Sequence, residues 1–497
     1  MMRTPIPLLL CFALLAPLPG SAQAIPDHPS KLVFKPLAFE VPKAREARIK
    51  LKNGVTAYLV EDPTGQPLVD VSVLIRGGAH LEPAGKEGLA GLHVAVLRSG
   101  GTLRTPADKL DARLDYLAAQ LGAGLGRDQG HAVLNLNALA KDSREGLELL
   151  AEVLREPAFA QDRLDLAKRN ARQGIERRND DTTGIERYQL ELLLRGEGYF
   201  TTRFATAASL EGISRDDLLA FHQRLLHPDN LIVAVSGRFD RTAMTALLNA
   251  TLGELKAASA ARRSPPIPPP SHTAKPGIFV THKDVNQGRV SFALPGLKRA
   301  DPDWTAVEVM NFLLGGDFTS RMVMKIRTEE GLAYSVGTRF TPGMAFPGDF
   351  RGAFQTKTRT VAYGLRLALA ELAKMRDTPV TDEELARAKG AIIDGFPARF
   401  SSSGEVADLF QNEDYQGGAE DYWAQYRAKV QAVTKAEIQR VARKYLDTAK
   451  LVILCVGHAK DMEAGDPKDH PGLLKDTATL PLTVLPLRDP LTMQLLK

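Results

Sequence analysis

Two hydrophobic periods alternate along the chain and predict strands and helices in turn. Residues 131–139 alternate between apolar and polar positions, which is typical of a half-buried strand. Residues 143–155 repeat their apolar positions at helical spacing instead. The first half therefore predicts a hairpin over 47–62 about Asn53-Gly54, strands over 68–75 and 131–139, and helices over 106–121 and 143–155.

The second half shows the same mixture of patterns. It predicts strands over 290–294 and 332–340 and helices over 305–314, 320–328 and 361–375. Hairpins mixed with helices favour an α+β sandwich over a purely parallel sheet.

Similar segments recur along the chain at nearly one spacing. A helix, a short turn and an apolar strand occur around Leu231 and again around Leu451, 220 positions later. A second pair of segments aligns Leu164 with Leu385, an offset of 221. Because two pairs of segments agree within one residue, we expect a duplication and two homologous halves.

A proline-rich segment over 258–276 separates these halves. Prolines favour extended geometry and donate no backbone hydrogen bond, so we expect a semi-rigid linker. The predicted organisation is an N-terminal domain over 45–257, this linker, and a C-terminal domain over 277–460. The sequence of the tail over 461–497 predicts no role.

Residues 1–24 have the pattern of a secretory signal peptide. One positive charge at Arg3 precedes an apolar stretch over 5–18, and an Ala-Gln-Ala cleavage site ends at Ala24. We expect secretion across the inner membrane and, in a Gram-negative source, residence in the periplasm. Lipid attachment at Cys11 is disfavoured because the preceding leucine is bulky.

The composition, 44% hydrophobic and 25% charged, is that of an ordinary globular protein. A net charge of +5 without any basic run argues against a nucleic-acid partner. No later segment approaches about 18 unbroken apolar residues, so we expect no membrane span. Signal cleavage would leave Cys455 as the only thiol, so the mature chain could form no internal disulfide.

A family resemblance rests on NFLLGGDFTSRMVMKIRTEEGLAYSVGTRF over 311–340. This segment resembles the second-domain signature of the insulinase (pitrilysin-like) zinc peptidases. Segments over 54–62, 71–102 and 147–159 resemble that family's first domain in order and spacing. The resemblance spans about 45–460 and implies two homologous α/β sandwich domains of the LuxS- and processing-peptidase-like metallohydrolase fold.

Peptide-cleaving members of that family carry H-x-x-E-H, in which the histidines bind zinc and the glutamate activates water. Here the corresponding positions hold Gly91, Val94 and Ala95 or, in a second register, Leu92, Ala95 and Val96, and the third-ligand position holds Gln173 or Gly174. Because zinc needs His, Cys or carboxylate ligands, we expect no catalytic zinc on this chain.

Two other residues, His93 and Glu176, are possible metal ligands. His93 lies in the same predicted helix, but it has no histidine or acid three or four positions away, so a structural role is favoured. Glu176 follows the third-ligand position by two residues and lies among arginines, which favours a solvated charge. The remaining histidines, including His222 and His227, lack ligand spacing.

Arg327 and Tyr334 match the family motif of the second domain. The helix from Ser320 is expected to end near Glu329 with Gly331 as its left-handed stop, and Tyr334 is expected on the following strand. By resemblance, such a pair points across a chamber at the zinc site and binds the substrate backbone and the forming oxyanion. The structural alternative is a capping arginine beside a half-buried strand tyrosine.

The resemblance therefore implies an exported, non-catalytic subunit of a heterodimeric zinc peptidase, inactive alone. Its partners would be a zinc-bearing insulinase-family subunit with H-x-x-E-H and a peptide substrate. One alternative is a structural or peptide-binding scaffold of the same fold, and a less favoured one is an autonomous hydrolase with a relocated metal. The sequence does not reveal the substrate.

Overall fold

The computed structural model describes residues 27–28, 31–32, 39–257, 259 and 261–496. The chain divides into two compact units, Met1–Glu40 and Val41–Lys497, and the second contains both sheets. The expected signal peptide and Cys11 lie outside the described residues, so export stays a prediction. Within the described ranges, every helix is too short or too polar to cross a bilayer.

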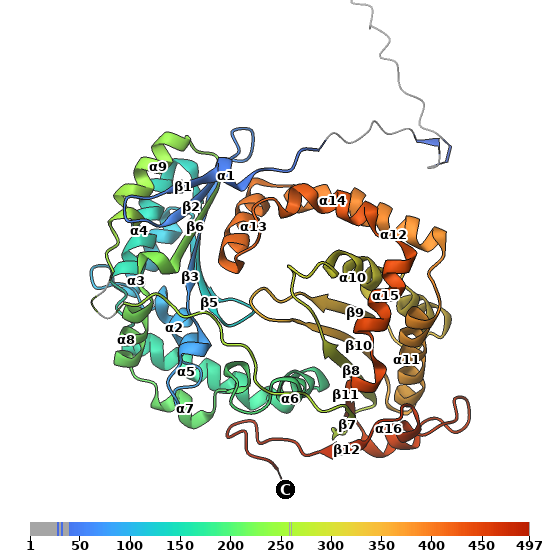
Figure 1. Ribbon diagram of the computed structural model, residues 1–497. Coiled ribbons are helices and arrows are strands. Elements are labelled where there is room, and N and C mark those ends of the chain that lie inside the picture. Colours follow the sequence, from blue (N-terminus) through green and yellow to red (C-terminus); the bar gives the residue numbers. More distant parts are fainter. Residues whose placement is uncertain (1–26, 29–30, 33–38, 258, 260, 497) are drawn as a thin grey trace, which may run out of the picture. The chain divides into compact units, whose positions relative to one another are not determined.

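The first half is built on a six-stranded sheet with the order β1-β2-β6-β3-β5-β4 (Figure 1). Its strands are β1 (Arg48–Lys50), β2 (Thr56–Glu61), β3 (Leu68–Arg76), β4 (Gln120–Leu125), β5 (His131–Leu139) and β6 (Leu231–Gly237). The hairpin expected about Asn53-Gly54 is the antiparallel pair β1–β2. Gly54 has a φ of +91°, a conformation that favours glycine.

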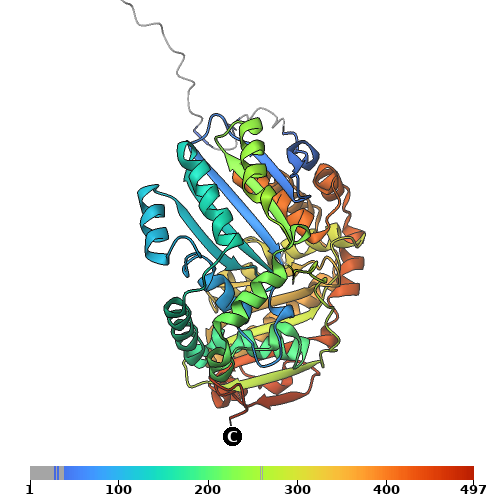
Figure 2. The ribbon, with the colours of Figure 1, turned by 90° about the vertical axis from the view of Figure 1, so that its left-hand side faces the viewer.

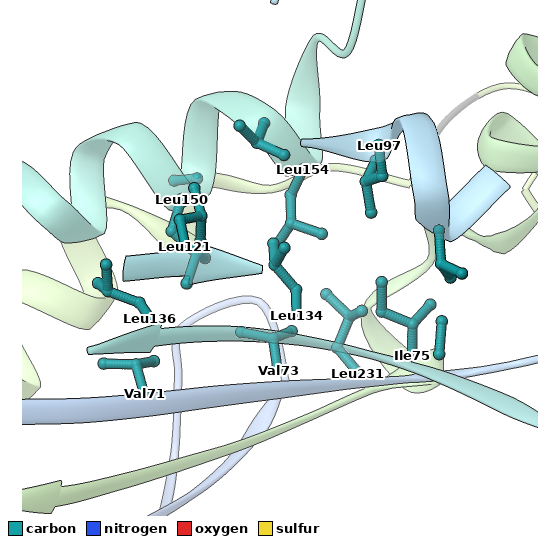
Figure 3. Close-up of a cluster of buried hydrophobic side chains, with 14 of the residues drawn as sticks. Val71, Val73, Ile75, Leu97, Leu121, Leu134, Leu136, Leu150, Leu154 and Leu231 are labelled. Carbon is teal, nitrogen blue, oxygen red and sulfur yellow. The ribbon is translucent and has the colours of Figure 1, made fainter. Parts of the chain in front are cut away.

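Helices cover one face of this sheet, which is the side seen in Figure 2. The helices of this half are α1 (Ala44–Ala47), α2 (Leu89–Leu97), α3 (Ala107–Tyr116), α4 (Ser143–Arg155), α5 (Gln161–Glu176), α6 (Thr182–Arg195), α7 (Ala207–Gly212), α8 (Arg215–Leu225) and α9 (Arg241–Ala250). Alternate strand residues such as Val73 and Leu134 point into this layer and pack near Leu154 of α4 (Figure 3). This cluster is the main core of the first half.

The helix predicted over 106–121 is wrong in its last turn. Helix α3 ends at Tyr116, Ala118 has a φ of +48°, and Leu121 belongs to strand β4. Glycines at 122 and 124 disfavour a helix, and the strand still buries Leu121 in the core. The apolar residues that suggested one helix belong to two elements, α3 and β4, which contribute to the same core.

The second half repeats this plan with the strand order β12-β7-β11-β8-β10-β9. Its strands are β7 (Gly277–His282), β8 (Gln287–Pro295), β9 (Val336–Thr341), β10 (Asp349–Lys357), β11 (Val452–Gly457) and β12 (Leu482–Leu485). In both halves one parallel pair, β2–β6 or β7–β11, is followed by three antiparallel pairs. The repeated order supports the duplication expected from the sequence.

The helices of the second half are α10 (Trp304–Asn311), α11 (Val361–Asp377), α12 (Asp382–Gly395), α13 (Ser403–Gln416), α14 (Tyr422–Ala432), α15 (Lys435–Tyr445) and α16 (Ala459–Ala464). Cys455 is a free thiol buried in β11, where burial raises its pKa to about 12. Residues 261–276 between the two sheets form no helix or strand.

Each half lends one helix to the sheet of the other half (Figure 1). Ile185 and Tyr188 of α6 pack in one cluster with Val452 and Leu454 of the second sheet. In return, α13 packs on the first sheet, where Phe410 meets Tyr58 with ring centroids 5.9 Å apart. This exchange gives each sheet a cover on the face opposite its own helix layer.

The tail, for which the sequence predicted no role, also joins the halves. Strand β12 adds to the edge of the second sheet, parallel to β7. The chain then runs along the first half, where Gln189 Nε2 donates to the Pro486 carbonyl at 2.9 Å. Arg178 donates to the Pro490 carbonyl at 2.8 Å.

Candidate functional site

Arg327 and Tyr334 lie on either side of a sharp turn before β9. The helix continues over 321–329, and Val323–Glu329 has π-helical hydrogen bonding. Gly331 has a φ of +62°, as expected for a left-handed helix stop. The strand predicted over 332–340 begins only at Val336, so Tyr334 lies two residues before it and not on it.

The structure brings Arg327 and Tyr334 together in an aromatic stack. The Arg327 guanidinium carbon lies 5.2 Å from the centroid of the Tyr334 ring and 5.2 Å from that of Phe318. Tyr334 is 89% exposed and Phe318 is 74% exposed. The alternative of a half-buried strand tyrosine is therefore wrong, and Phe318 is a member of this cluster that the sequence analysis missed.

The side-chain hydrogen-bonding groups of Arg327 and Tyr334 have no partner among the described residues. Across the described ranges, Arg327 makes no side-chain hydrogen bond or ion pair, and its contacts are to the two rings. A guanidinium presents five donors in a fixed fork, and a phenol can donate one more hydrogen bond. The arrangement can therefore bind backbone carbonyls, carboxylates or a developing oxyanion.

The segment that carries this stack is anchored on both sides. Arg321 forms a two-pronged ion pair with Glu384 of α12, with N–O distances of 2.7 and 2.8 Å. This pair lowers the pKa of Glu384 to about 2. After the turn, Thr356 Oγ donates to the Leu332 carbonyl at 2.8 Å. Exposed aromatic rings are thus presented from a backbone that is held in place.

The helix that should carry a zinc motif has an apolar pocket instead. A cavity of about 620 Å³ lies between α2 and α5, and Gly91, Leu92 and Ala95 contribute to its wall. From α5 the lining includes Asn170 and Ala171, one turn before Gln173 and Gly174. Val94 and Val96 are buried elsewhere in the core. The pocket walls carry no group of zinc ligands.

His93 turns away from this pocket into the core. It is 1% exposed, and its Nε2 lies 3.0 Å from Nδ1 of His222. Nε2 of His222 lies 2.8 Å from the Leu154 carbonyl, which can only accept. His222 therefore carries its proton on Nε2, and His93 donates to His222 Nδ1. Both histidines therefore form buried hydrogen bonds and have a structural role.

Burial keeps this histidine pair neutral. Desolvation lowers the pKa of His222 to about 4 and lowers that of His93 well below its usual range. The other candidate, Glu176, is exposed and accepts from Arg172 at 3.1 Å, as the charge pattern predicts. In the parts of the chain that the structure describes, no three His, Cys, Asp or Glu side chains are grouped to hold a metal ion.

Comparison with known families assigns the chain to a family and separates its two halves. Residues 58–194 match the profile described as insulinase (peptidase family M16). Residues 212–392 match the one described as peptidase M16 inactive domain. The chain belongs to peptidase family M16, the insulinase family, as the motifs predicted.

The curated relatives include one that is named as lacking peptidase activity and several that are named uncharacterized zinc proteases. A Helicobacter pylori protein named non-peptidase homolog YmxG is 26% identical over 402 residues, which cover 79% of this chain and 90% of that protein. Together with the inactive-domain match, this relative supports a non-catalytic M16-fold protein. It also agrees with the expectation that this chain binds no catalytic zinc.

Solved structures confirm the fold. A peptidase M16 inactive domain from Pseudomonas fluorescens is similar with a TM-score of 0.73 and 24% identity, over 83% of this chain and 98% of that one. A chain of complex III from Candida albicans is similar with a TM-score of 0.67 and 18% identity, over 84% and 96%. The predicted pair of insulinase-like α/β domains is therefore correct.

Proposed function

We propose that this chain is the exported, non-catalytic subunit of a heterodimeric insulinase-family zinc peptidase. In this complex a second subunit with H-x-x-E-H holds the zinc, and this chain presents Arg327 and Tyr334 to the bound peptide. The observation that carries the proposal is the Arg327 guanidinium, which lies beside two exposed rings with its donors unused by the described protein.

Each subunit has its own chemical task in this proposal. Zinc in the partner would polarise the scissile carbonyl and activate water. The Arg327 guanidinium donates to the peptide backbone or to the oxyanion. The Tyr334 hydroxyl adds a neutral donor next to it. Both side chains bind and orient substrate without transferring a proton.

Arg327→Ala tests this role in the mixed complex. We expect kcat/KM on a quenched peptide to fall about 30- to 1000-fold, because lost oxyanion donors typically cost about 2–4 kcal/mol. Arg359→Ala is a matched control, since the Arg359 side chain is 71% exposed and lies outside the stack. Wild-type rates for the Arg327→Ala complex would refute the proposal.

A scaffold or peptide-binding protein without any part in hydrolysis is the second candidate. The apolar pocket at the usual zinc position and the likeness to a complex III chain favour it. It predicts that no H-x-x-E-H subunit gains activity when this chain is added. An autonomous hydrolase would instead require stoichiometric zinc in the purified chain.

Export is a separate part of the proposal, supported by the pattern of residues 1–24. N-terminal sequencing of the protein from the periplasmic fraction should begin at Ile25. A cytoplasmic protein that keeps Met1 would contradict export without touching the Arg327 test.

A further inference from the structure

The apolar pocket between α2 and α5 has the form of a small-molecule site. The two helices lie side by side (Figure 1). The volume of the pocket, about 620 Å³, falls within the range of about 300–1,000 Å³ that is usual for ligand sites in proteins. Gly91 and Ala95 of α2 and Ala167 and Ala171 of α5 line it, each pair one helical turn apart. Small side chains on both helices therefore leave the space between them.

One end of the pocket is polar. There the end of α2 meets the start of α5, and the Ala160 amide donates to the Gly100 carbonyl at 3.3 Å. Ser99 and Arg163, which lie next to this contact in the sequence, both line the pocket. A ligand at this end meets a hydroxyl and a guanidinium.

The other end of the pocket is apolar. A Cβ atom on Gly88, at the start of α2, would lie 3.0 Å from the side chains of Ala205 and Leu210, and all three residues line the pocket. Ile175, near the end of α5, also lines it. Arg163 and Ile175 are twelve positions apart on α5, which corresponds to about 18 Å along a helix. A ligand that fills the pocket is therefore long, apolar and polar at one end only.

The charge of the pocket is positive. Among the described residues that line it, Arg163 is the only charged one. Its guanidinium lies 3.6 Å from a carboxylate oxygen of Asp111 and 3.7 Å from one of Asp162, and it donates no hydrogen bond within the described ranges. Asp111 lies closer to Arg98, at 2.5 Å. The donors of Arg163 are thus available to an anion in the pocket.

Arg98 gives a second indication that acceptors are too few at this end. Its Nε is buried and has no hydrogen-bond partner in the part of the chain that the structure describes. Buried N–H groups normally have a partner. Arg98 and Arg163 share the carboxylate of Asp111, so a second carboxylate would complement the charge of this region.

We propose that the pocket between α2 and α5 binds a free fatty acid, with its carboxylate at Arg163 and its alkyl chain directed toward Leu210. A guanidinium binds a carboxylate through two parallel hydrogen bonds. No aromatic side chain of the described residues lines the pocket, so a flat ligand would find no ring to stack on, whereas an alkyl chain packs on aliphatic walls. This site goes beyond the proposed function and requires neither a partner subunit nor a peptide.

Calorimetric titration of the full, delipidated chain tests the inference. The probes are octanoate, decanoate and dodecanoate below the concentrations at which they form micelles. We expect one site per chain and an affinity that rises about fourfold with each added methylene, the gain from burying one CH₂ group. The matched ligand is 1-decanol, which has the same chain without the charge. Decanoate should bind about tenfold more tightly than 1-decanol, and less so at high salt.

Substitution of the arginine tests the polar end. Arg163→Gln should remove the preference for decanoate over 1-decanol and leave the affinity for 1-decanol unchanged. Arg169→Gln is the charge-matched control, because Arg169 is exposed on the same helix and does not line the pocket. It should bind both ligands like the wild type.

Filling the pocket tests the apolar part. Gly91→Leu should weaken decanoate and 1-decanol alike, about tenfold or more, because it occupies space that several methylenes would use. A Cβ at Gly91 meets no atom within 4 Å, and leucine favours a helix more than glycine does, so this variant should stay folded. Gly390→Leu in α12 is the matched control, since a Cβ there meets only the Asp394 carboxylate at 4.0 Å.

Four outcomes would overturn the inference. They are equal affinity for decanoate and 1-decanol, a wild-type preference in Arg163→Gln, wild-type affinity in Gly91→Leu, or tighter binding of a leucine-rich peptide amide than of dodecanoate. The last result would assign the pocket to peptide side chains. Circular dichroism and thermal unfolding show whether each variant is folded. Because no hydrolysis is measured, failure here leaves the Arg327 experiment standing, and failure of that experiment leaves this one standing.

Discussion

The α2 region of the first half and the turn before β9 in the second half differ in what their side chains do. In the first half, the α2 region has small and apolar side chains at its pocket and turns its one histidine inward to His222. In the second half, an anchored turn exposes Phe318 and Tyr334 beside the half-buried Arg327. The second half thus presents aromatic and cationic groups at its surface, whereas the α2 region of the first half presents an apolar pocket.

Because of this contrast, we expect substitutions in the two regions to affect different properties, stability in one and activity in the other. Substitutions around α2 should change stability and leave any shared activity nearly intact, apart from loss of folded protein. Substitutions in the stack should change activity and leave stability intact, because exposed side chains away from special features contribute within about 0.5 kcal/mol.

The largest effect on stability is expected from His222→Ala. This change removes a fully buried ring, the donor to the Leu154 carbonyl and the acceptor of His93. We expect a loss of about 3–5 kcal/mol of unfolding free energy, from a cavity together with unpaired polar groups. Urea denaturation measures it.

His227→Ala is the matched control for that experiment, because His227 is partly exposed and accepts only from the Asp229 amide. It should cost less than about 1 kcal/mol, the usual size of one surface hydrogen bond. Equal losses in the two variants would mean that the His93–His222 pair does not support the first half.

Acidic pH should weaken the same region. The pKa of His222 is near 4 in the folded chain and near 6.5 when unfolded, so the unfolded state binds more protons between these values. Its contribution is fully present above about pH 6.5 and is lost as pH falls toward about 4, on the order of 3 kcal/mol. The pKa of His93 is also lowered by burial, so His93 adds to the loss of stability at acidic pH.

A pH series of urea titrations checks this expectation, with a His222→Gln variant as the comparison. The variant should lose less stability than the wild type between pH 6.5 and pH 4, because one titrating group is gone. Parallel curves for the two proteins would exclude His222 as the source of acid sensitivity.

A smaller effect is expected from Phe318→Ala in the second half. Removing one ring frees the Arg327 guanidinium, and an exposed cation–π contact is worth about 0.5–1 kcal/mol. We expect kcat/KM of the mixed complex to fall about two- to fivefold while the melting temperature stays unchanged. Met324→Ala is the control, since Met324 is exposed on the same helix and has no aromatic ring. An unchanged rate would remove Phe318 from the site.

Gly331→Ala should have an effect of similar size, on stability alone. Its φ of +62° disfavours any side chain with a Cβ, although no atom lies within 4 Å of that position. The expected cost is about 1 kcal/mol of stability from backbone strain alone. A stabilising result would show that the turn before Tyr334 is not held in the left-handed conformation.

Local patterns predicted the local elements well. The strand over 131–139 and the helix over 143–155 have the expected bounds, because each needs only its own periodicity and a buried face. The spacing of Arg327 and Tyr334 identified two members of the stack. Phe318 was missed because eight residues separate it from Arg327 in the sequence, and the contact appears only once the path of the helix between them is known.

Features that depend on distant partners could not be predicted. The amphipathic patterns of α6 and α13 do not reveal that each helix covers the sheet of the other half. A cross-strand row of the polar residues Ser236, Asp70 and Asn137 exists only once the strand order is known. A usable signal was present in Asn135 and Asn137, which alternate with the leucines of one strand, but alternation alone indicates only a solvated face.

The exchange of α6 and α13 has a consequence for how this protein can be divided. A gene break inside 258–276 would yield two fragments, each with an apolar sheet face whose cover belongs to the other. Neither fragment should accumulate alone in soluble form, whereas simultaneous production should restore the whole. Either half could therefore lose its catalytic residues during evolution, but neither could be deleted without exposing the sheet of the other.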